Sequence, residues 1–91
     1  MLRRKRPQAP RYRQGAVDAL ATNVVMNHSV GNYFESNYDF DNLVAQARNC
    51  PVFKDKLERG FRAALMRYPF FKKDDPTRLH FLEKLRENDL D

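Results

Sequence analysis

The stretch Pro51–Tyr68, PVFKDKLERGFRAALMRY, is the longest segment of this chain with a clear helical period. Pro51 suits the first helical position, and either Asn49 or Cys50 can cap the helix before it. Pro69 ends the helix, because the residue before a proline avoids the α conformation. The apolar residues share one stripe that the rest of the chain is expected to cover: Phe53, Leu57, Phe61, Ala64, Leu65 and Tyr68.

The opposite side of this helix is charged. Asp55 with Arg59 and Glu58 with Arg62 stand at the favourable i,i+4 spacing and are expected to pair. Glycine inside a helix costs roughly 1 kcal/mol relative to alanine, so Gly60 predicts that another helix crosses closely there. The charged side is either a solvated helix face or a protein-contact surface, and as a candidate binding surface it comprises Lys56, Arg59, Arg62, Met66 and Arg67.

A first amphipathic helix is predicted from about Gly15 to Ser29, with Gly31 ending it in the left-handed conformation. His28 lies on its apolar arc. No second metal-type ligand stands three or four residues away, so a partly buried imidazole bonded to a backbone carbonyl is expected rather than a metal ligand. The full arc is Val17, Leu20, Ala21, Val24 and His28.

A short second helix is predicted to start at the cap residue Asp39 and to end near Asn49. Almost no linker follows it, so we expect it to meet the Pro51–Tyr68 helix at a sharp corner rather than to lie antiparallel. Its apolar side comprises Phe40, Leu43, Val44 and Ala47. The loop before it holds three aromatic residues that are expected to close the end of the core: Tyr33, Phe34 and Tyr38.

The last helix is predicted from Asp75 and Pro76, a cap followed by a proline at the first position, to about Asn88. It should bury Phe81, Leu82 and Leu85, with Leu79 at the rim. The bend before it combines two exposed-looking aromatics with two cations and is a further candidate binding surface: Phe70, Phe71, Lys72 and Lys73.

The predicted fold class is therefore all-α, a small bundle of four unequal amphipathic helices, the second being the shortest, preceded by an extended basic N-terminal arm. Residues 1–14 form the arm, and residues 15–91 form a single helical domain. The arm contains no acid, two prolines and no apolar period, so it is expected to gain order from a partner. Its candidate binding residues are Arg3, Arg4, Lys5, Arg6, Arg11, Tyr12 and Arg13.

The composition argues against several classes of chemistry. The only cysteine, Cys50, excludes an internal disulfide and fits a reducing intracellular compartment, and with two separated histidines it makes no zinc pattern. No phosphate-binding glycine motif occurs, so we expect no cofactor, no metal and no catalytic site. No apolar run is long enough to span a membrane. The acid-free N-terminus has the composition of a mitochondrial leader, although Pro7 and Pro10 oppose the helix that such leaders form.

The charge is segregated, with a net value of +5. The arm and the Pro51–Tyr68 helix are positive, and the segments beside them are negative. The leading hypothesis is a non-enzymatic interaction protein, a small helical subunit or adaptor of a larger assembly that its arm anchors to a protein partner. The alternative is a nucleic-acid-binding regulator or ribosome-associated protein that uses the arm and the basic helix face on RNA or DNA.

Overall fold

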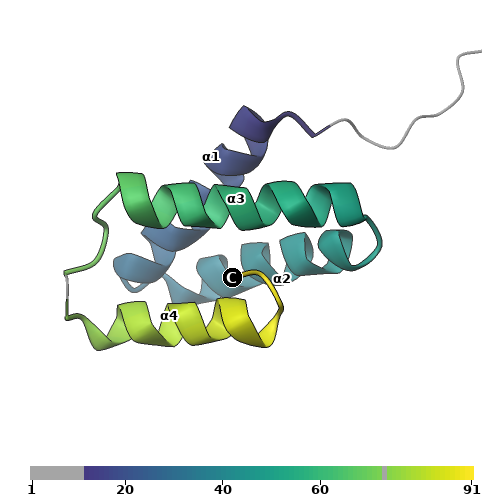
Figure 1. The fold of residues 1–91 in the computed structure, drawn as a ribbon. Helices are drawn as coiled ribbons and strands as arrows, with labels where there is room; N and C mark the ends of the chain where they lie inside the picture. The colour runs from purple at the N-terminus through teal and green to yellow at the C-terminus, as the bar shows by residue number, and fades with distance from the viewer. Residues whose placement is uncertain (1–11, 73) are drawn as a thin grey trace, which may run out of the picture.

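The structure, a computed structural model, describes residues 12–72 and 74–91. Four helices follow one another: α1 (Gln14–Ser29), α2 (Tyr33–Arg48), α3 (Pro51–Arg67) and α4 (Pro76–Glu87) (Figure 1). The residues so described contain helices and turns without any strand, which confirms the all-α prediction. The helices are unequal, but the shortest is α4 with 12 residues, and α2 is as long as α1.

Local signals set most of the helix ends. The Cys50 thiol accepts a hydrogen bond from the backbone N–H of Phe53 at the start of α3. At the start of α4, an Asp75 carboxylate oxygen accepts one from the N–H of Thr77 at 2.9 Å. Gly31 ends α1 with φ +88°, and the N–H of Asn32 reaches back to the carbonyl of Asn27. This is the Schellman arrangement that glycine favours.

Helix α2 begins six residues before the predicted cap, Asp39, so the expected aromatic loop does not exist. The Schellman turn of α1 leads directly into α2, and the buried hydroxyl of Ser36 donates to the carbonyl of Val24 at 3.0 Å, which fixes the first turn of α2 against α1. Of the three aromatic residues expected to close the core, Phe34 and Tyr38 instead point outward on α2, whereas Tyr33 is partly exposed and covers the buried His28, with 5.1 Å between ring centroids.

Helices α2 and α3 form an antiparallel pair, so the predicted sharp corner is wrong. Phe40 and Phe61 stand at similar distances along the chain from the short connection, and their ring centroids are 5.7 Å apart. At a right-angled corner these residues would be separated by roughly 20 Å, given a rise of about 1.5 Å per residue. Figure 1 shows the chain reversing direction between the two helices.

Helix α1 crosses α3 at Gly60, as the position of this glycine predicts. A Cβ atom built on Gly60 would lie 3.2 Å from the Cβ of Ala21 and 3.3 Å from both the carbonyl oxygen of Val17 and the carboxylate of Asp18. A larger residue would therefore push the two helices apart. The close approach allows the apolar stripe of α3 to bury against α1, with Phe53, Leu57 and Phe61 fully covered.

The inward face of α1 differs from the predicted arc at two positions. Leu20 is 46% exposed, whereas Val25, which was not assigned to the arc, is fully buried. The reason is that α3 lies on the Val25 side of the helix, and the crossing angle decides which border of an apolar arc is covered. On α3 itself, Leu65 is half-buried and Tyr68 is exposed at the end of the stripe.

Aromatic side chains fill the centre of the domain. The rings of Phe40, Phe61 and Phe81 contact one another at 5.7 to 6.2 Å between centroids. Phe71, which was expected to be exposed in the bend, is buried and lies 6.5 Å from Phe81, while Phe70 is half-buried. Among the described residues of the predicted bend surface, Lys72 is the exposed one, and Lys73 lies outside the described residues.

The crossing at Gly60 gives a stability prediction. The variant Gly60→Ala should lower the free energy of unfolding by roughly 1 kcal/mol, because overpacking against the Val17 carbonyl costs about 1–3 kcal/mol and exceeds the helix-propensity gain of about 1 kcal/mol. Gly15→Ala is the matched control, since a Cβ at Gly15 meets nothing within 4 Å, and it should stabilise the protein. Chemical denaturation of both variants checks this, and equal stabilisation would contradict the close crossing.

Candidate functional site

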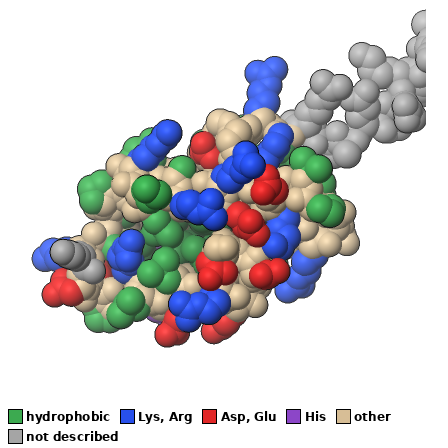
Figure 2. Space-filling view, viewed as in Figure 1, with side chains coloured by type: hydrophobic (Ala, Val, Ile, Leu, Met, Phe, Trp, Pro, Cys, Tyr) green, Lys and Arg blue, Asp and Glu red, His purple; other side chains and the backbone are tan. Residues whose placement is uncertain are grey.

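An open seam separates α3 from α4 on the face shown in Figure 2. Along the full described length of both helices, no Cα atom of α3 comes within 8 Å of a Cα atom of α4, whereas α1 and α3 approach closely. Packed helices have axes 8–10 Å apart, so α3 and α4 are held wider than direct packing requires. Figure 2 shows hydrophobic side chains in this gap, with charged side chains around it.

Leu65 stands at the middle of the seam and lines both of its hollows. The wider hollow, of about 570 Å³, adjoins the bend between the helices, and the smaller one, of about 170 Å³, adjoins the C-terminus. We define the α3–α4 seam by the residues that line these two hollows: Glu58, Arg62, Leu65, Tyr68, Pro69, Phe71, Arg78, Leu82, Leu85, Leu90 and Asp91.

Three residues of the seam were not identified from the sequence: Arg78, Leu90 and Asp91. Leu90 is buried because the chain ends α4 in a second Schellman turn, with Asp89 at φ +59° and the N–H of Leu90 donating to the carbonyl of Leu85 at 2.8 Å. An apolar residue two positions after a helix cap is a signal that could have identified Leu90. No sequence pattern identifies Arg78, because it lies at the seam only through the way the bend between α3 and α4 is folded.

Charges of both signs surround the seam. Glu58 pairs with Lys54 at 2.8 Å rather than with Arg62 as predicted, and this hydrogen bond raises the pKa of Lys54. Lys54 also lies 3.4 Å from Asp89, which ties the start of α3 to the C-terminal turn. The predicted pair of Asp55 and Arg59 is present at 3.3 Å.

The predicted basic face of α3 is divided among three directions. Lys56 points towards the start of α1 and donates to the backbone carbonyl of Tyr12. Arg67 lines the groove between α1 and α3, whereas Arg62 lines the α3–α4 seam. Arg59 and Met66 are exposed to solvent. The structure therefore does not gather these five residues into one surface.

Two of the predicted arm residues can be placed. The ring of Tyr12 is half-buried 4.2 Å from that of Phe53, and its hydroxyl donates to the side chain of Gln46 at 3.1 Å. Tyr12 thus packs on the helical body, and Arg13 is exposed at the N-cap of α1. The other predicted arm residues lie outside the described part of the chain: Arg3, Arg4, Lys5, Arg6 and Arg11.

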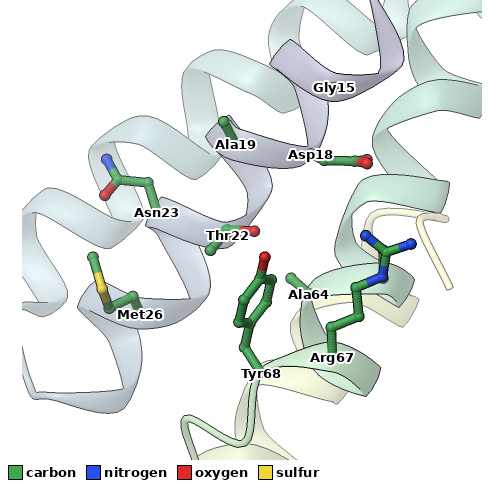
Figure 3. A pocket seen from close by; sticks show the side chains of 10 residues that line it. Gly15, Asp18, Ala19, Thr22, Asn23, Met26, Ala64, Arg67 and Tyr68 are labelled. Atoms are coloured by element: carbon green, nitrogen blue, oxygen red, sulfur yellow. The ribbon is translucent and has the colours of Figure 1, made fainter.

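A third hollow, of about 430 Å³, lies between α1 and the C-terminal end of α3 (Figure 3). In this view Thr22 of α1 and Tyr68 of α3 point towards each other, and Ala19 and Asn23 border the hollow from α1. Most of the lining is small or apolar, and Asp18 and Arg67 are its charged residues.

His28 is buried among aromatic rings at the end of α1. It is 2% exposed, its ring centroid is 5.1 Å from those of Tyr33 and Phe81, and His80 stacks on it at 5.9 Å. Within the described part of the chain neither ring nitrogen has a hydrogen-bond partner, so the expected bond to a backbone carbonyl is absent. Burial, and then the charges of Lys84 and His80, lower the pKa of His28 below 6.5.

Residues 12–72 and 74–91 contain no group of three or more His, Cys, Asp or Glu side chains that could hold a metal ion. The thiol of Cys50 caps α3. None of the four described helices is long and apolar enough to cross a membrane.

Comparison of the chain with protein-family models, with curated proteins and with solved structures finds no match. Its function must therefore be argued from its own surfaces.

The buried imidazole gives a pH prediction. The folded-state pKa of His28 lies below its unfolded value of about 6.5, so the unfolded state binds more protons and stability falls as the pH drops below about 6.5. The loss of stability is complete once the pH is below the folded-state pKa of His28. In the variant His28→Phe the dependence between about pH 7 and pH 5 should largely vanish, and the protein should be more stable at low pH.

Urea denaturation at a series of pH values measures this effect. His80→Asn is the comparison variant: it leaves the buried imidazole in place and removes only the charge of His80, the smallest of the three causes of the lowered His28 pKa, so most of the pH dependence should remain. An unchanged pH dependence in His28→Phe would show that other groups cause it.

Proposed function

We propose that this protein is a non-enzymatic interaction protein, a small helical subunit or adaptor whose α3–α4 seam receives an amphipathic helix from a partner protein. The observation that supports this proposal is the open seam itself. Its lining includes Leu65, Leu82 and Phe71, and the helices that bound it stand apart instead of closing over it. Helix-in-groove binding uses an apolar groove of this kind.

The dimensions of the seam suit a short helix. From Glu58 to Tyr68, α3 rises by about 15 Å, which is close to three helical turns. A partner helix of that length presents apolar side chains at positions i, i+4 and i+7. These would contact mainly the half-buried Leu65 and Leu82 in the middle, above a floor formed by Phe71 at one end and Leu85 with Leu90 at the other.

The charges at the two ends favour one orientation of the partner. Arg78 lines the hollow beside the bend, whereas Glu58 and Asp91 line the hollow at the C-terminus together with Arg62. We therefore expect the partner helix to carry an acidic residue at the Arg78 end and a basic residue at the other. Such pairs set orientation and specificity more than affinity.

The basic arm adds an electrostatic contribution to this proposal. Residues 1–11 carry five bases and no acid, so they attract an acidic protein surface and raise the rate of encounter. Because Tyr12 packs against Phe53 of α3, we expect the arm to contact the partner protein through Arg11 and the residues before it rather than through the Tyr12 ring.

Nucleic-acid binding is the second candidate, and the arm is its main support. The divided basic face of α3 weighs against it, because Lys56, Arg62 and Arg67 point towards different neighbours and Asp55 pairs with Arg59. A duplex backbone requires cations on one continuous surface.

The variant Leu82→Glu tests the seam. Affinity purification from cells that express the protein should recover a protein partner with the wild type, and Leu82→Glu should reduce the recovery by at least about tenfold, because a carboxylate in an apolar contact costs more than the 1.4 kcal/mol of a tenfold change. Leu79→Glu is the matched control: Leu79 is on the same helix, exposed and outside the seam, so recovery should be kept.

Circular dichroism of both variants shows whether they remain folded, and Leu65→Gln provides a milder change in the same seam. Equal recovery with the wild type, Leu82→Glu and Leu65→Gln would contradict the proposal. A 260 nm absorbance excess that high salt removes, without a protein partner, would favour the nucleic-acid candidate instead.

A further inference from the structure

Helix α1 is uncharged on its outward side as well as apolar on its inward side. Its 16 residues contain a single ionised side chain, Asp18, which points to the α3 border rather than outward. The residues of the outward side are exposed and carry no charge: Gly15, Ala16, Ala19, Asn23, Met26 and, at the C-cap, Val30. We call these six residues the outer face of α1. A helix without a charged face is typical of one that is covered on both sides.

The sizes of the side chains on the outer face are graded along the helix. The N-terminal half carries only small residues, Gly15, Ala16 and Ala19, whereas the C-terminal half carries Met26, 41% exposed, and Val30, 66% exposed. Asn23 lies between the two halves. Val30 and Ala16 are each seven positions from Asn23, so a second α1 placed antiparallel over Asn23 would bring each Val30 onto an Ala16.

The same pairing places Met26 of one copy beside Ala19 of the other, because these residues lie three and four positions from Asn23 on opposite sides of it. Large side chains thus meet small ones at both ends of the contact. At the centre, two Asn23 amides face each other, and a side-chain amide can donate to and accept from another amide. A face that is complementary to itself under a two-fold rotation is what an isologous dimer requires.

We propose that a second copy of this chain covers the outer face of α1, in a two-fold symmetric dimer with antiparallel α1 helices centred on Asn23. A different partner protein would not require the side-chain sizes of the outer face to change from small to large on either side of Asn23, whereas a second copy does. The contact is about 24 Å long and would bury roughly 400 Å² on each copy, about half the area of a standard specific interface, so the dimer is expected to be weak and reversible.

The dimer leaves the α3–α4 seam open, so it goes beyond the proposed function and can fail independently of it. Four residues of the outer face, Gly15, Ala19, Asn23 and Met26, also border the hollow beside Tyr68 (Figure 3), and all four are exposed, so a second copy can reach them from solvent.

Sedimentation velocity of the full chain from about 1 µM to about 1 mM, the range of weak dissociation constants, tests the proposal. The wild type should pass from monomer to dimer. Asn23→Arg brings two like charges together on the two-fold axis and should remain a monomer throughout, with an unchanged circular dichroism spectrum. Asn42→Arg, the same change at an exposed position of α2, should dimerise as the wild type does. A monomeric wild type, or a dimeric Asn23→Arg, would overturn the proposal.

Cysteine cross-linking tests the symmetry. In a Cys50→Ser background, which keeps an oxygen to cap α3, Asn23→Cys should give a disulfide-linked dimer under mild oxidation, and Asn42→Cys should not. Equal cross-linking of both variants would show that dimerisation does not centre on Asn23.

Discussion

The close crossing of α1 and α3 at Gly60 is the constraint on which the rest of the structure depends. Backbone and short side chains of α1 fill the space that a Cβ at Gly60 would need, so the apolar faces of α1 and α3 meet closely at this crossing. The turn at Gly31 then directs α2 back along α1, and the short connection at Asn49 and Cys50 returns the chain as α3. The backbones of α1, α2 and α3 approach one another closely. Helix α4 is packed against them in a different way.

Helix α4 is held mainly by aromatic side chains. Its Cα atoms come within 8 Å of those of α1, but across the described helices they do not approach those of α2 or α3. Phe81 fills the intervening space, with its ring against those of Phe40, Phe61 and His28. Large rings support a helix at a distance, and the same distance opens the seam in which Leu65 and Leu82 stay half-buried. The proposed binding function therefore follows from how the last helix is packed.

Local sequence signals predicted the parts of the fold that depend on neighbouring residues. The α3 stripe, the cap at Asp75, the turn at Gly31 and the crossing at Gly60 are of this kind. What depended on tertiary packing was missed. The start of α2 is fixed by a hydrogen bond from Ser36 to α1, and the burial of Val25 in place of Leu20 follows from the side on which α3 lies. The seam could not be predicted, because it follows from the spacing between α3 and α4. The division of the basic face of α3 could not be predicted either, because its bases turn towards three different neighbours only once the helices are assembled.

An open α3–α4 seam is the central claim, since the proposed function requires apolar side chains that solvent can reach. Nuclear magnetic resonance of the methyl-labelled protein with a soluble paramagnetic agent measures this directly. The signals of Leu65 and Leu82 should be strongly broadened, whereas those of Leu57, which is fully buried, should be preserved. If Leu65 and Leu82 were as well protected as Leu57, α3 and α4 would be in direct contact in solution, and that result would contradict the account.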